Sequence, residues 1–395
     1  GTISRLSERA RYARPAFVTL ADRIASYIVV ALLVVAAGVA TFWYFADPDR
    51  AFVITLSVLV VTCPCALALA TPAAFAAAGS RLSQLRLLVT NGNAIEALSK
   101  ATLAVFDKTG TLTMGMPRIA AVFVIDNAFT EKDCRLIAAA LEHASTHPLA
   151  RAFALQELLP EVSSPDIVVG QGVAGTIDGR AWRIGNAGFV GGGAAADDSS
   201  TTHVFLGVDG NAVAWFEIED ELRPDASQTL ESLRRLGLDT SLVSGDNKVA
   251  VENIAKALDI RDVHYACTPE DKLAVIEAAQ RRGERVVMIG DGINDAPVLA
   301  GADTSIAPAH GALLAQTSAD IILLGDSLTP LTTAIDMSRK TMRIVRQNLS
   351  WAIVYNTLAL PLAAAGFVPP WLAAIGMSAS SLVVVLNALR LNRFE

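Results

Sequence analysis

The stretch LAVFDKTGTLT, residues 103–113, joins a short apolar run to a polar turn that contains a glycine. Two later segments have the same form, TSLVSGDN at residues 240–247 and VVMIGDGIND at residues 286–295. Each is typical of a buried strand with polar side chains at its carboxyl end, and stretches of helical pattern lie between them, at 224–236 and 248–257. Strands that alternate with helices indicate a parallel sheet, and such sheets bind ligands beyond the carboxyl ends of their strands.

Three long runs without a charged residue flank this region, at 24–46, 51–80 and 347–389. A helix that crosses the hydrocarbon core of a bilayer needs about 20 apolar residues. The first run therefore fits one helix, the second fits one long helix with room for a break, and the third fits two helices separated at 366–370. Soluble cores rarely run this long without charge. We expect four transmembrane helices, with the lipid bilayer as a partner.

Arginines near these runs predict the orientation of the chain in the membrane. They precede the first run, follow the second, precede the third at 339–346 and follow the last at 390–393, whereas the short connections hold few charges. Positive charge favours the cytosolic side, so both termini and the loop 81–346 should be cytosolic. The net charge of −7 argues against a nucleic-acid partner. Four cysteines are too few for a disulfide framework.

The motif at 107–113, together with GDGIND at 290–295, resembles the phosphorylation domain of P-type ATPases, within the haloacid dehalogenase superfamily. The resemblance implies a multidomain membrane protein. Its α/β haloacid-dehalogenase-like phosphorylation domain would comprise residues 81–118 and 218–335, with an inserted α+β nucleotide-binding domain at 119–217. Two pairs of transmembrane helices would lie at 21–80 and 347–390, and residues 1–20 resemble the segment that follows the actuator domain of the family.

The residue types in these motifs suit phosphoryl transfer from ATP. The carboxylate of Asp107 can attack the γ-phosphoryl group and form an aspartyl phosphate. Catalysis is then mostly positioning and charge neutralisation. By resemblance, Lys272 pairs with the phosphoryl oxygens, Ser244 and Thr109 donate hydrogen bonds to them, and Asn294 and Asp295 support the site. The further catalytic candidates are Lys108, Thr111 and Asp246, and the candidate oxygen ligands of Mg²⁺ are Asp107, Thr109 and Asp291.

Thr109 distinguishes a pump from a phosphatase. Phosphatases of this superfamily usually carry a second aspartate two residues after the nucleophile, where it acts as a general acid. Without that acid the aspartyl phosphate should survive longer, as a transport cycle requires. A membrane-anchored phosphatase is therefore disfavoured.

Residues between the strands resemble the nucleotide-binding domain of heavy-metal P-type ATPases. The similar segments are EHASTHPL at 142–149, GQGV at 170–173 and IGN at 184–186, although Thr146 replaces a glutamate that is common in the family. The resemblance implies that His147 packs near the adenine and that glycines let the backbone approach the nucleotide. The matching positions are Glu142, His147, Gly170, Gly172, Gly185 and Asn186.

Cys63-Pro64-Cys65 lies in the middle of the second apolar run. Proline breaks the hydrogen-bond ladder of a helix, and broken helices at membrane depth mark ion pathways. Two thiolates at such a break suit Cu(I), Zn²⁺ or Cd²⁺. The later residues Tyr355, Asn356, Met377, Ser380 and Ser381 resemble the signature of copper-transporting members. A thioether favours Cu(I) over Zn²⁺, and a last span without charge suits a monovalent ion.

Together the motifs predict ATP-driven transport of monovalent copper, with silver as an alternative ion. The resemblance implies export from the cytosol, a bacterial inner membrane and delivery of copper by a chaperone. The Thr-Gly-Glu motif of the actuator domain and a Cys-x-x-Cys metal-binding domain are not found in the sequence, so we expect a fragment or one part of a split protein, which alone hydrolyses ATP slowly. Two alternatives remain open: a zinc or cadmium pump, and a metal- and nucleotide-binding membrane protein that does not turn over.

Overall fold

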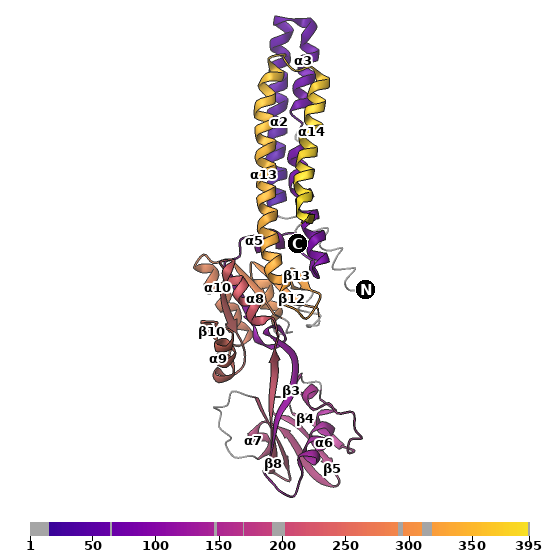
Figure 1. Cartoon of the computed structure of the whole chain (residues 1–395), viewed down its shortest axis with the longest axis vertical. Helices are drawn as coiled ribbons and strands as arrows, with labels where there is room; N and C mark the ends of the chain where they lie inside the picture. Colours follow the sequence, from indigo (N-terminus) through magenta and orange to yellow (C-terminus); the bar gives the residue numbers. More distant parts are fainter. Residues whose placement is uncertain are drawn as a thin grey trace.

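The computed structural model is elongated, with a helical bundle at one end, an α/β domain in the middle and a second sheet domain at the other end (Figure 1). It describes residues 16–63, 65–145, 148–168, 170–191, 202–290, 295–309 and 318–393, with side chains from residue 30 onward except at 67, 148, 202 and 393.

The bundle consists of α2 (Ala16–Ala46), α3 (Pro48–Val61), α4 (Cys65–Gln84), α13 (Pro330–Ala364) and α14 (Pro370–Leu389), which run side by side (Figure 1). The second apolar run is broken, as expected, between Val61 and Cys65. Small side chains such as Ala36, Ala363 and Ala373 let the helices approach closely. Large apolar side chains face outward instead, as Phe45 and Phe52 do at 81% and 75% exposure.

By length and hydropathy alone, one helix within the described residues, Pro370–Asn392, is long and apolar enough to cross a membrane, and Val30–Ala46 forms a shorter apolar helix. The other expected spans are shorter or more polar, for reasons visible in the chain. The second run is split at the cysteines, and α13 carries charges up to Arg346 and polar side chains such as Tyr355 and Asn356 beyond it. The expectation of four spans therefore depends on the bundle as a whole.

The middle domain is built on a seven-stranded sheet of order β1-β13-β12-β11-β2-β9-β10. All neighbouring pairs are parallel except β1 with β13. The strands are β1 (Leu87–Val89), β2 (Leu103–Asp107), β9 (Asp239–Val243), β10 (Asp262–His264), β11 (Val286–Ile289), β12 (Thr304–Pro308) and β13 (Ile321–Leu323). The helices are α5 (Ala94–Ser99), α8 (Ala226–Arg235), α9 (Lys248–Ala257), α10 (Pro269–Arg281) and α11 (Ala296–Gly301).

The three strands expected from the sequence are β2, β9 and β11, and β2 lies between the other two. Every residue of β2 and β11 is buried, which explains why both strands are apolar without alternation. Because all three run in one direction, their polar carboxyl ends meet at one edge of the sheet. The sequence expectation of a parallel α/β sheet is confirmed.

The far domain is a six-stranded antiparallel sheet of order β3-β8-β7-β6-β5-β4. Its strands are β3 (Thr113–Val124), β4 (Ser163–Val168), β5 (Gly172–Ile177), β6 (Arg180–Gly185), β7 (Thr202–Val208) and β8 (Asn211–Leu222), with helices α6 (Glu131–Glu142) and α7 (Ala187–Val190) and the 3₁₀ turn Pro148–Phe153. The long strands β3 and β8 connect it to the middle domain (Figure 1). The expected domain boundaries near 118 and 218 lie inside these two strands.

Candidate active site and metal site

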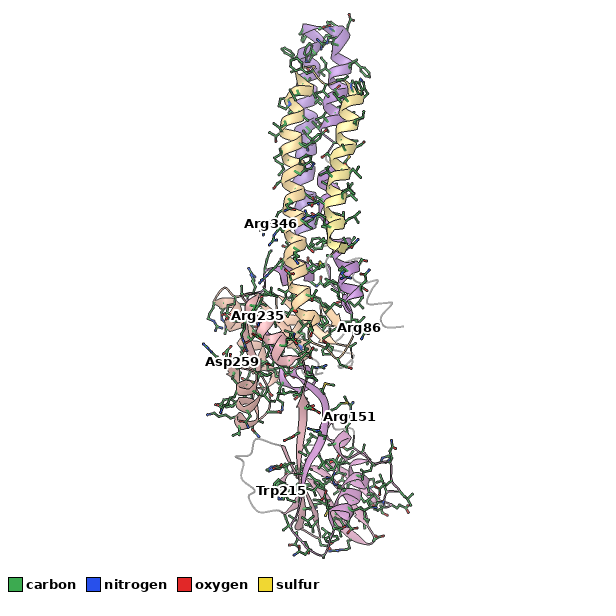
Figure 2. The ribbon with its side chains drawn as sticks, viewed as in Figure 1. Arg86, Arg151, Trp215, Arg235, Asp259 and Arg346 are labelled. Carbon is green, nitrogen blue, oxygen red and sulfur yellow. A yellow bond between two sulfur atoms is a disulfide. The ribbon has the colours of Figure 1, made fainter. Side chains whose placement is uncertain are left out.

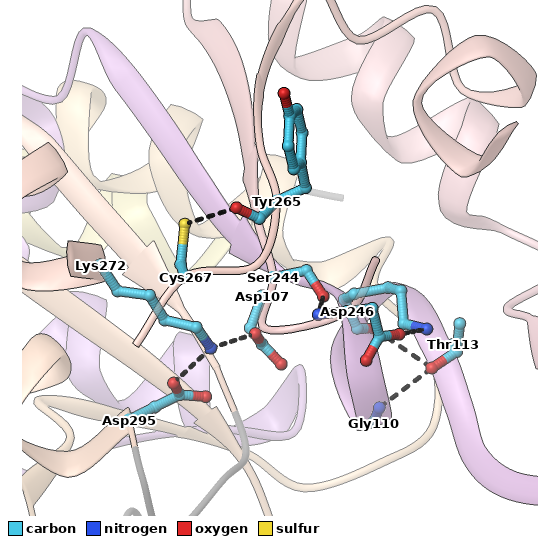
Figure 3. Close-up of polar contacts among 10 residues, drawn as sticks. Asp107, Gly110, Thr113, Ser244, Asp246, Tyr265, Cys267, Lys272 and Asp295 are labelled. Carbon is cyan, nitrogen blue, oxygen red and sulfur yellow. Dashed lines mark hydrogen bonds and ion pairs between the residues drawn. The ribbon is translucent and has the colours of Figure 1, made fainter. Parts of the chain in front are cut away.

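The candidate nucleophile Asp107 is the last residue of β2, where it pairs in register with Val243 of β9. Ser244 follows Val243 directly, so the ends of the two strands place both side chains at one edge of the sheet (Figure 3). Asp107 is 6% exposed and Ser244 is 2% exposed. A reacting group at this edge is therefore held by residues with little freedom to move.

Lys272, from the first turn of α10, reaches across to this edge and joins two carboxylates (Figure 3). Its Nζ donates to Oδ1 of Asp107 at 2.6 Å and to Oδ1 of Asp295 at 2.8 Å. All three side chains are at least nine-tenths buried. Burial by itself lowers the pKa of Lys272, but the two carboxylates outweigh it and raise that pKa to about 12. Lys272 is a fixed positive charge beside Asp107.

A second lysine lies on the other side of the site. Lys108 forms an ion pair with Asp246, whose backbone N–H donates to the hydroxyl oxygen of Ser244 at 3.2 Å. Burial lowers the pKa of Lys108, and the nearby carboxylates of Asp220 and Asp107 oppose that shift. The structure thus brings together Asp107, Lys108, Ser244, Asp246, Lys272 and Asp295, as the sequence predicted for one site.

The turn after Asp107 is tight, with Gly110 at φ 69°, a conformation that favours glycine. The hydroxyl of the expected catalytic residue Thr111 is fully buried without a hydrogen-bond partner in the described structure, so Thr111 contributes through its backbone carbonyl. Arg223, which sequence reasoning missed, donates to the carbonyl oxygens of Thr111 at 2.7 Å, Gly110 at 2.9 Å and Asp326. In the sequence, only its position directly after the end of β8 could have indicated this role.

Replacing Arg223 with Met should destabilise the middle domain. Arg223 is 2% exposed, and its removal leaves three carbonyl oxygens without their donor. We expect the free energy of unfolding to fall by about 3 kcal/mol or more, because each buried carbonyl that loses its donor costs about 1–3 kcal/mol. Thermal unfolding followed by intrinsic fluorescence measures the loss. Arg118→Met is the matched control, since Arg118 is 61% exposed and lies 3.8 Å from Glu221, and it should cost less than about 1 kcal/mol. Equal losses in the two variants would contradict this role.

A second contact that sequence reasoning missed lies where β8 meets the turn. Asp220 accepts hydrogen bonds from the hydroxyl of Thr113 and, at 3.1 Å, from the backbone N–H of Met116. Thr113 in turn accepts from the N–H of Gly110 at 3.0 Å. The strand that leads to the far domain is therefore tied directly to the turn that follows the candidate nucleophile Asp107.

Oxygen donors that suit Mg²⁺ are present at this edge of the sheet. Asp107 offers a carboxylate beside the turn that contains Thr109, and a hard divalent cation prefers such ligands. The expected magnesium ligand Asp291 and the expected supporting residue Asn294 lie outside the described residues. The donor set that the structure describes is consistent with the expected cation.

The residues of the far domain that are expected to bind the nucleotide fall into two groups. Glu142, at the end of α6, lines a cavity of about 450 Å³ with His143, Arg151 and Phe153 among its walls. Burial raises the pKa of Glu142, although a hydrogen bond with Ser145 opposes the shift. His147 lies outside the described residues.

The glycines and Asn186 form the second group, and they are not part of the lining of that cavity. Gly172 and Gly185 are register partners on β5 and β6, and a Cβ on either would overlap a backbone carbonyl oxygen of the other segment. Asn186 donates from its side chain to the carbonyl of Gly170 at 3.3 Å and caps α7 through Phe189. In this structure the glycines allow two backbone segments to approach each other.

In the bundle, Cys63 and Cys65 lie at the break between α3 and α4, and their sulfurs are joined as a disulfide. Both sulfurs therefore face one point, and both must be reduced before they can act as thiolate ligands. Pro64 lies outside the described residues. In the parts of the chain that the structure describes, no three or more His, Cys, Asp or Glu side chains are arranged so that they could hold a metal ion.

The candidate metal-site residues on α13 and α14 are positioned by contacts between these two helices. The ring of Tyr355 lies against Gly376, next to Met377, so closely that a Cβ at Gly376 would be 2.7 Å from the Tyr355 hydroxyl. Ser380 is 3% exposed and accepts a hydrogen bond from the Trp351 indole at 3.1 Å. Asn356 and Ser381 are half-buried on the same two helices. Trp351 is a further residue that the sequence motifs did not single out.

Comparisons with known proteins agree with this architecture. A family model described as haloacid dehalogenase-like hydrolase matches residues 101–303. The chain is 39% identical to a protein named copper-exporting P-type ATPase from Mycobacterium tuberculosis (strain ATCC 25618 / H37Rv), over 99% of this chain and 53% of that protein. The crystal structure of a zinc-transporting PIB-type ATPase in its E2.Pi state is similar with a TM-score of 0.75 at 30% identity, over 99% of this chain and 66% of that chain.

A third comparison concerns the middle and far domains. The structure of the catalytic CPx-ATPase domain CopB-B is similar with a TM-score of 0.55 at 30% identity, over 66% of this chain and 98% of that chain. The chain spans about half the length of the curated relatives that it matches.

Proposed function

This chain belongs to the heavy-metal P-type ATPases, within the haloacid dehalogenase-like hydrolases, and from that membership we propose that it is the catalytic and ion-conducting part of a pump that moves monovalent copper across a membrane. The observation that carries the proposal is the buried Asp107–Lys272–Asp295 network at the carboxyl ends of the strands. A nucleophile beside a fixed positive charge is the arrangement that phosphoryl transfer from ATP requires.

In the proposed reaction, a carboxylate oxygen of Asp107 attacks the γ-phosphorus of ATP. The bond between that phosphorus and the oxygen that bridges to the β-phosphate breaks, and ADP leaves. Lys272 and Lys108 neutralise charge on the phosphoryl oxygens, and the hydroxyls of Ser244 and Thr109 donate to them. Mg²⁺, held by Asp107, Thr109 and Asp291, would neutralise further phosphate charge. The far domain would hold the base and ribose near Glu142, His147, Gly170, Gly172, Gly185 and Asn186.

Helix α13 offers a physical connection between phosphorylation and transport. It is one helix of 35 residues, Pro330–Ala364, that begins in the middle domain and continues into the bundle with Tyr355 and Asn356. Its start is tied to the middle domain, because Asp225 accepts from the backbone N–H groups of Leu328 and Thr329 at 2.6 and 3.0 Å. A movement of the middle domain would therefore be passed along this helix to its end at Tyr355 and Asn356.

The choice of ion is the finer part of the proposal, since similar proteins are named for copper and for zinc. Thiolates of Cys63 and Cys65 and the thioether of Met377 are soft ligands that favour Cu(I). The flanking residues Tyr355, Asn356, Ser380 and Ser381 add polar groups without charge. We further propose export from the cytosol of a bacterium across its inner membrane, with copper supplied by a chaperone. A zinc pump is the second candidate.

The test of ion choice is metal-stimulated ATP hydrolysis by the pump that contains this chain. Cu(I) or Ag(I) should stimulate hydrolysis and Zn²⁺ should not. Cys63→Ser and Cys65→Ser should each remove the stimulation, because a hydroxyl binds Cu(I) far more weakly than a thiolate does. Nucleotide binding, measured separately, should stay unchanged in both variants.

Met377→Leu is the matched variant, because it retains most of the side-chain volume and removes only the sulfur. It should raise the Cu(I) concentration needed for half-maximal stimulation without unfolding the bundle. Stimulation by Zn²⁺ in place of Cu(I) would refute copper and leave the pump proposal standing.

A further inference from the structure

A cavity of about 300 Å³ lies between the end of α5 and one face of α13, where the bundle meets the middle domain. Its lining consists of Ser99, Lys100, Arg339, Met342, Arg343 and Arg346. Four of these six residues are cationic. Figure 2 places Arg346 at this junction, on the outer side of α13.

The positive charge of this pocket is mostly uncompensated. Lys100 pairs with Glu96 at 2.7 Å. Arg339 donates to two neutral backbone carbonyls, those of Leu236 and Ala101. Arg343 and Arg346 are exposed and have no carboxylate partner in the described part of the chain. Three of the four cations therefore remain available to an anion.

The spacing of the arginines concentrates this charge on one stripe. Positions 339, 343 and 346 lie four and three residues apart, so their side chains share one face of α13. Like charges at this spacing destabilise a helix. Since the stripe weakens the helix that carries it, intrinsic helix stability does not account for it, whereas a bound anion would relieve the repulsion.

The depth of the stripe matches the headgroup layer of a bilayer. The run without charge begins at Gln347, directly after Arg346. With a rise of about 1.5 Å per residue, Arg343 lies about 4.5 Å and Arg339 about 10 Å below Arg346 along the helix axis. The headgroup region on each side of a bilayer is roughly 5–7 Å thick. Arg346 and Arg343 are thus at the level of lipid phosphates.

The surface directly beyond the pocket is apolar. Ile353 and Val354, seven and eight residues after Arg346 and on the same side of α13, are 59% and 53% exposed. If the phosphate group of a larger molecule occupied the pocket, the rest of that molecule would lie against these side chains. Free phosphate would gain nothing from them, whereas the acyl chain of a lipid would.

We propose that this pocket binds the phosphate headgroup of an anionic phospholipid from the cytosolic leaflet, and that the bound lipid bridges α5 and α13. The interaction goes beyond the general preference of arginine for the cytosolic side, because it assigns one lipid to one pocket. It requires that the bundle spans the membrane with the middle domain on the cytosolic side, and so it does not depend on which ion is transported.

Native mass spectrometry of the detergent-purified chain tests the proposal. Phosphatidylglycerol should bind more tightly than phosphatidylcholine with the same acyl chains. The double variant Arg343→Gln with Arg346→Gln should weaken phosphatidylglycerol binding about thirtyfold, at about fivefold for each arginine near the membrane surface. The charge-conserving pair Arg343→Lys with Arg346→Lys should retain most of the binding.

Arg390→Gln is the matched control, since Arg390 lies at the end of α14 beyond the same charge-free run but outside the pocket. It should leave phosphatidylglycerol binding unchanged. Equal weakening by Arg390→Gln, or equal binding of the two lipids, would overturn the proposal. Displacement of the lipid by millimolar inorganic phosphate would instead assign the pocket to free phosphate and overturn the lipid assignment. Retained nucleotide binding verifies that each variant is folded.

Discussion

In Asp107→Asn, acid-stable and hydroxylamine-sensitive labelling by γ-labelled ATP is expected to fall to background. The amide is nearly isosteric with the carboxylate, but it is not a nucleophile toward phosphorus, so no aspartyl phosphate can form. Lys272 retains Asp295 as its partner at 2.8 Å, and the like-charge repulsion between the two carboxylates disappears. The variant should therefore fold at least as well as the parent, and the loss of labelling should reflect chemistry alone.

Asp262→Asn is the control for this experiment. Asp262 is at the start of β10 in the same sheet, away from the carboxyl ends of the strands, and contacts His264. Its replacement should leave labelling intact. Labelling of the Asp107→Asn protein at the level of the parent would refute the assignment of the nucleophile and, with it, the proposed reaction.

The second large effect is expected in Lys272→Met. The change removes the charge that lies between the buried carboxylates of Asp107 and Asp295. Breaking a buried ion pair in this way costs about 3–5 kcal/mol of folding free energy. Loss of one charge-stabilising group at the reacting centre should also slow phosphorylation about 10²–10³-fold. Rapid-quench labelling and thermal unfolding measure the two effects.

The pH dependence separates the two roles of Lys272. Its folded pKa of about 12 lies above the ordinary value of 10.5. The stability that its charge contributes is therefore fully present below pH about 10.5 and is lost as the pH rises through about 12. Between pH 6 and 9 the parent protein should show no change in stability from this group. In Lys272→Met the loss of stability between pH about 10.5 and about 12 should be absent, whereas labelling should stay slow throughout pH 6 to 9.

Lys272→Met combined with Asp295→Asn tests the same network. The double variant removes one of the two carboxylate charges that faced the lysine, so it should recover part of the lost stability without recovering the rate of labelling. Recovery of both would mean that Lys272 acts only through folding. Recovery of neither would contradict the proposed coupling of the three side chains.

Several features of the fold followed from local sequence alone. The apolar runs 103–106, 240–243 and 286–289 are strands because they are short, bounded by polar turns and buried on both faces. Helical patterns at 224–236 and 248–257 became α8 and α9. The break at Cys63 and Cys65 followed from the proline between them. Each of these depends on interactions over a few residues, which sequence pattern records directly.

Residues far apart in the chain could not be assigned in the same way. The sequence pattern alone gives no reason for Arg223 to bond to the carbonyls of Gly110 and Thr111, because that contact forms only when β8 returns beside β3. Hydropathy likewise predicted each span as a helix that could cross the membrane by itself. Helix α13 is partly polar and depends on its neighbours in the bundle.

The sequence by itself determined the parallel sheet and the candidates for its chemistry, which are the proposed nucleophile Asp107, its lysine and the soft sulfurs, because residue type and local pattern specify them. Only the tertiary structure decided the order β11-β2-β9, which brings residues 107, 244, 272 and 295 to one edge. It also decided that α13 runs unbroken from that domain into the bundle and that its arginines border a pocket beside α5. These outcomes depend on which distant surfaces bury each other, and burial between distant segments is a property of the folded chain.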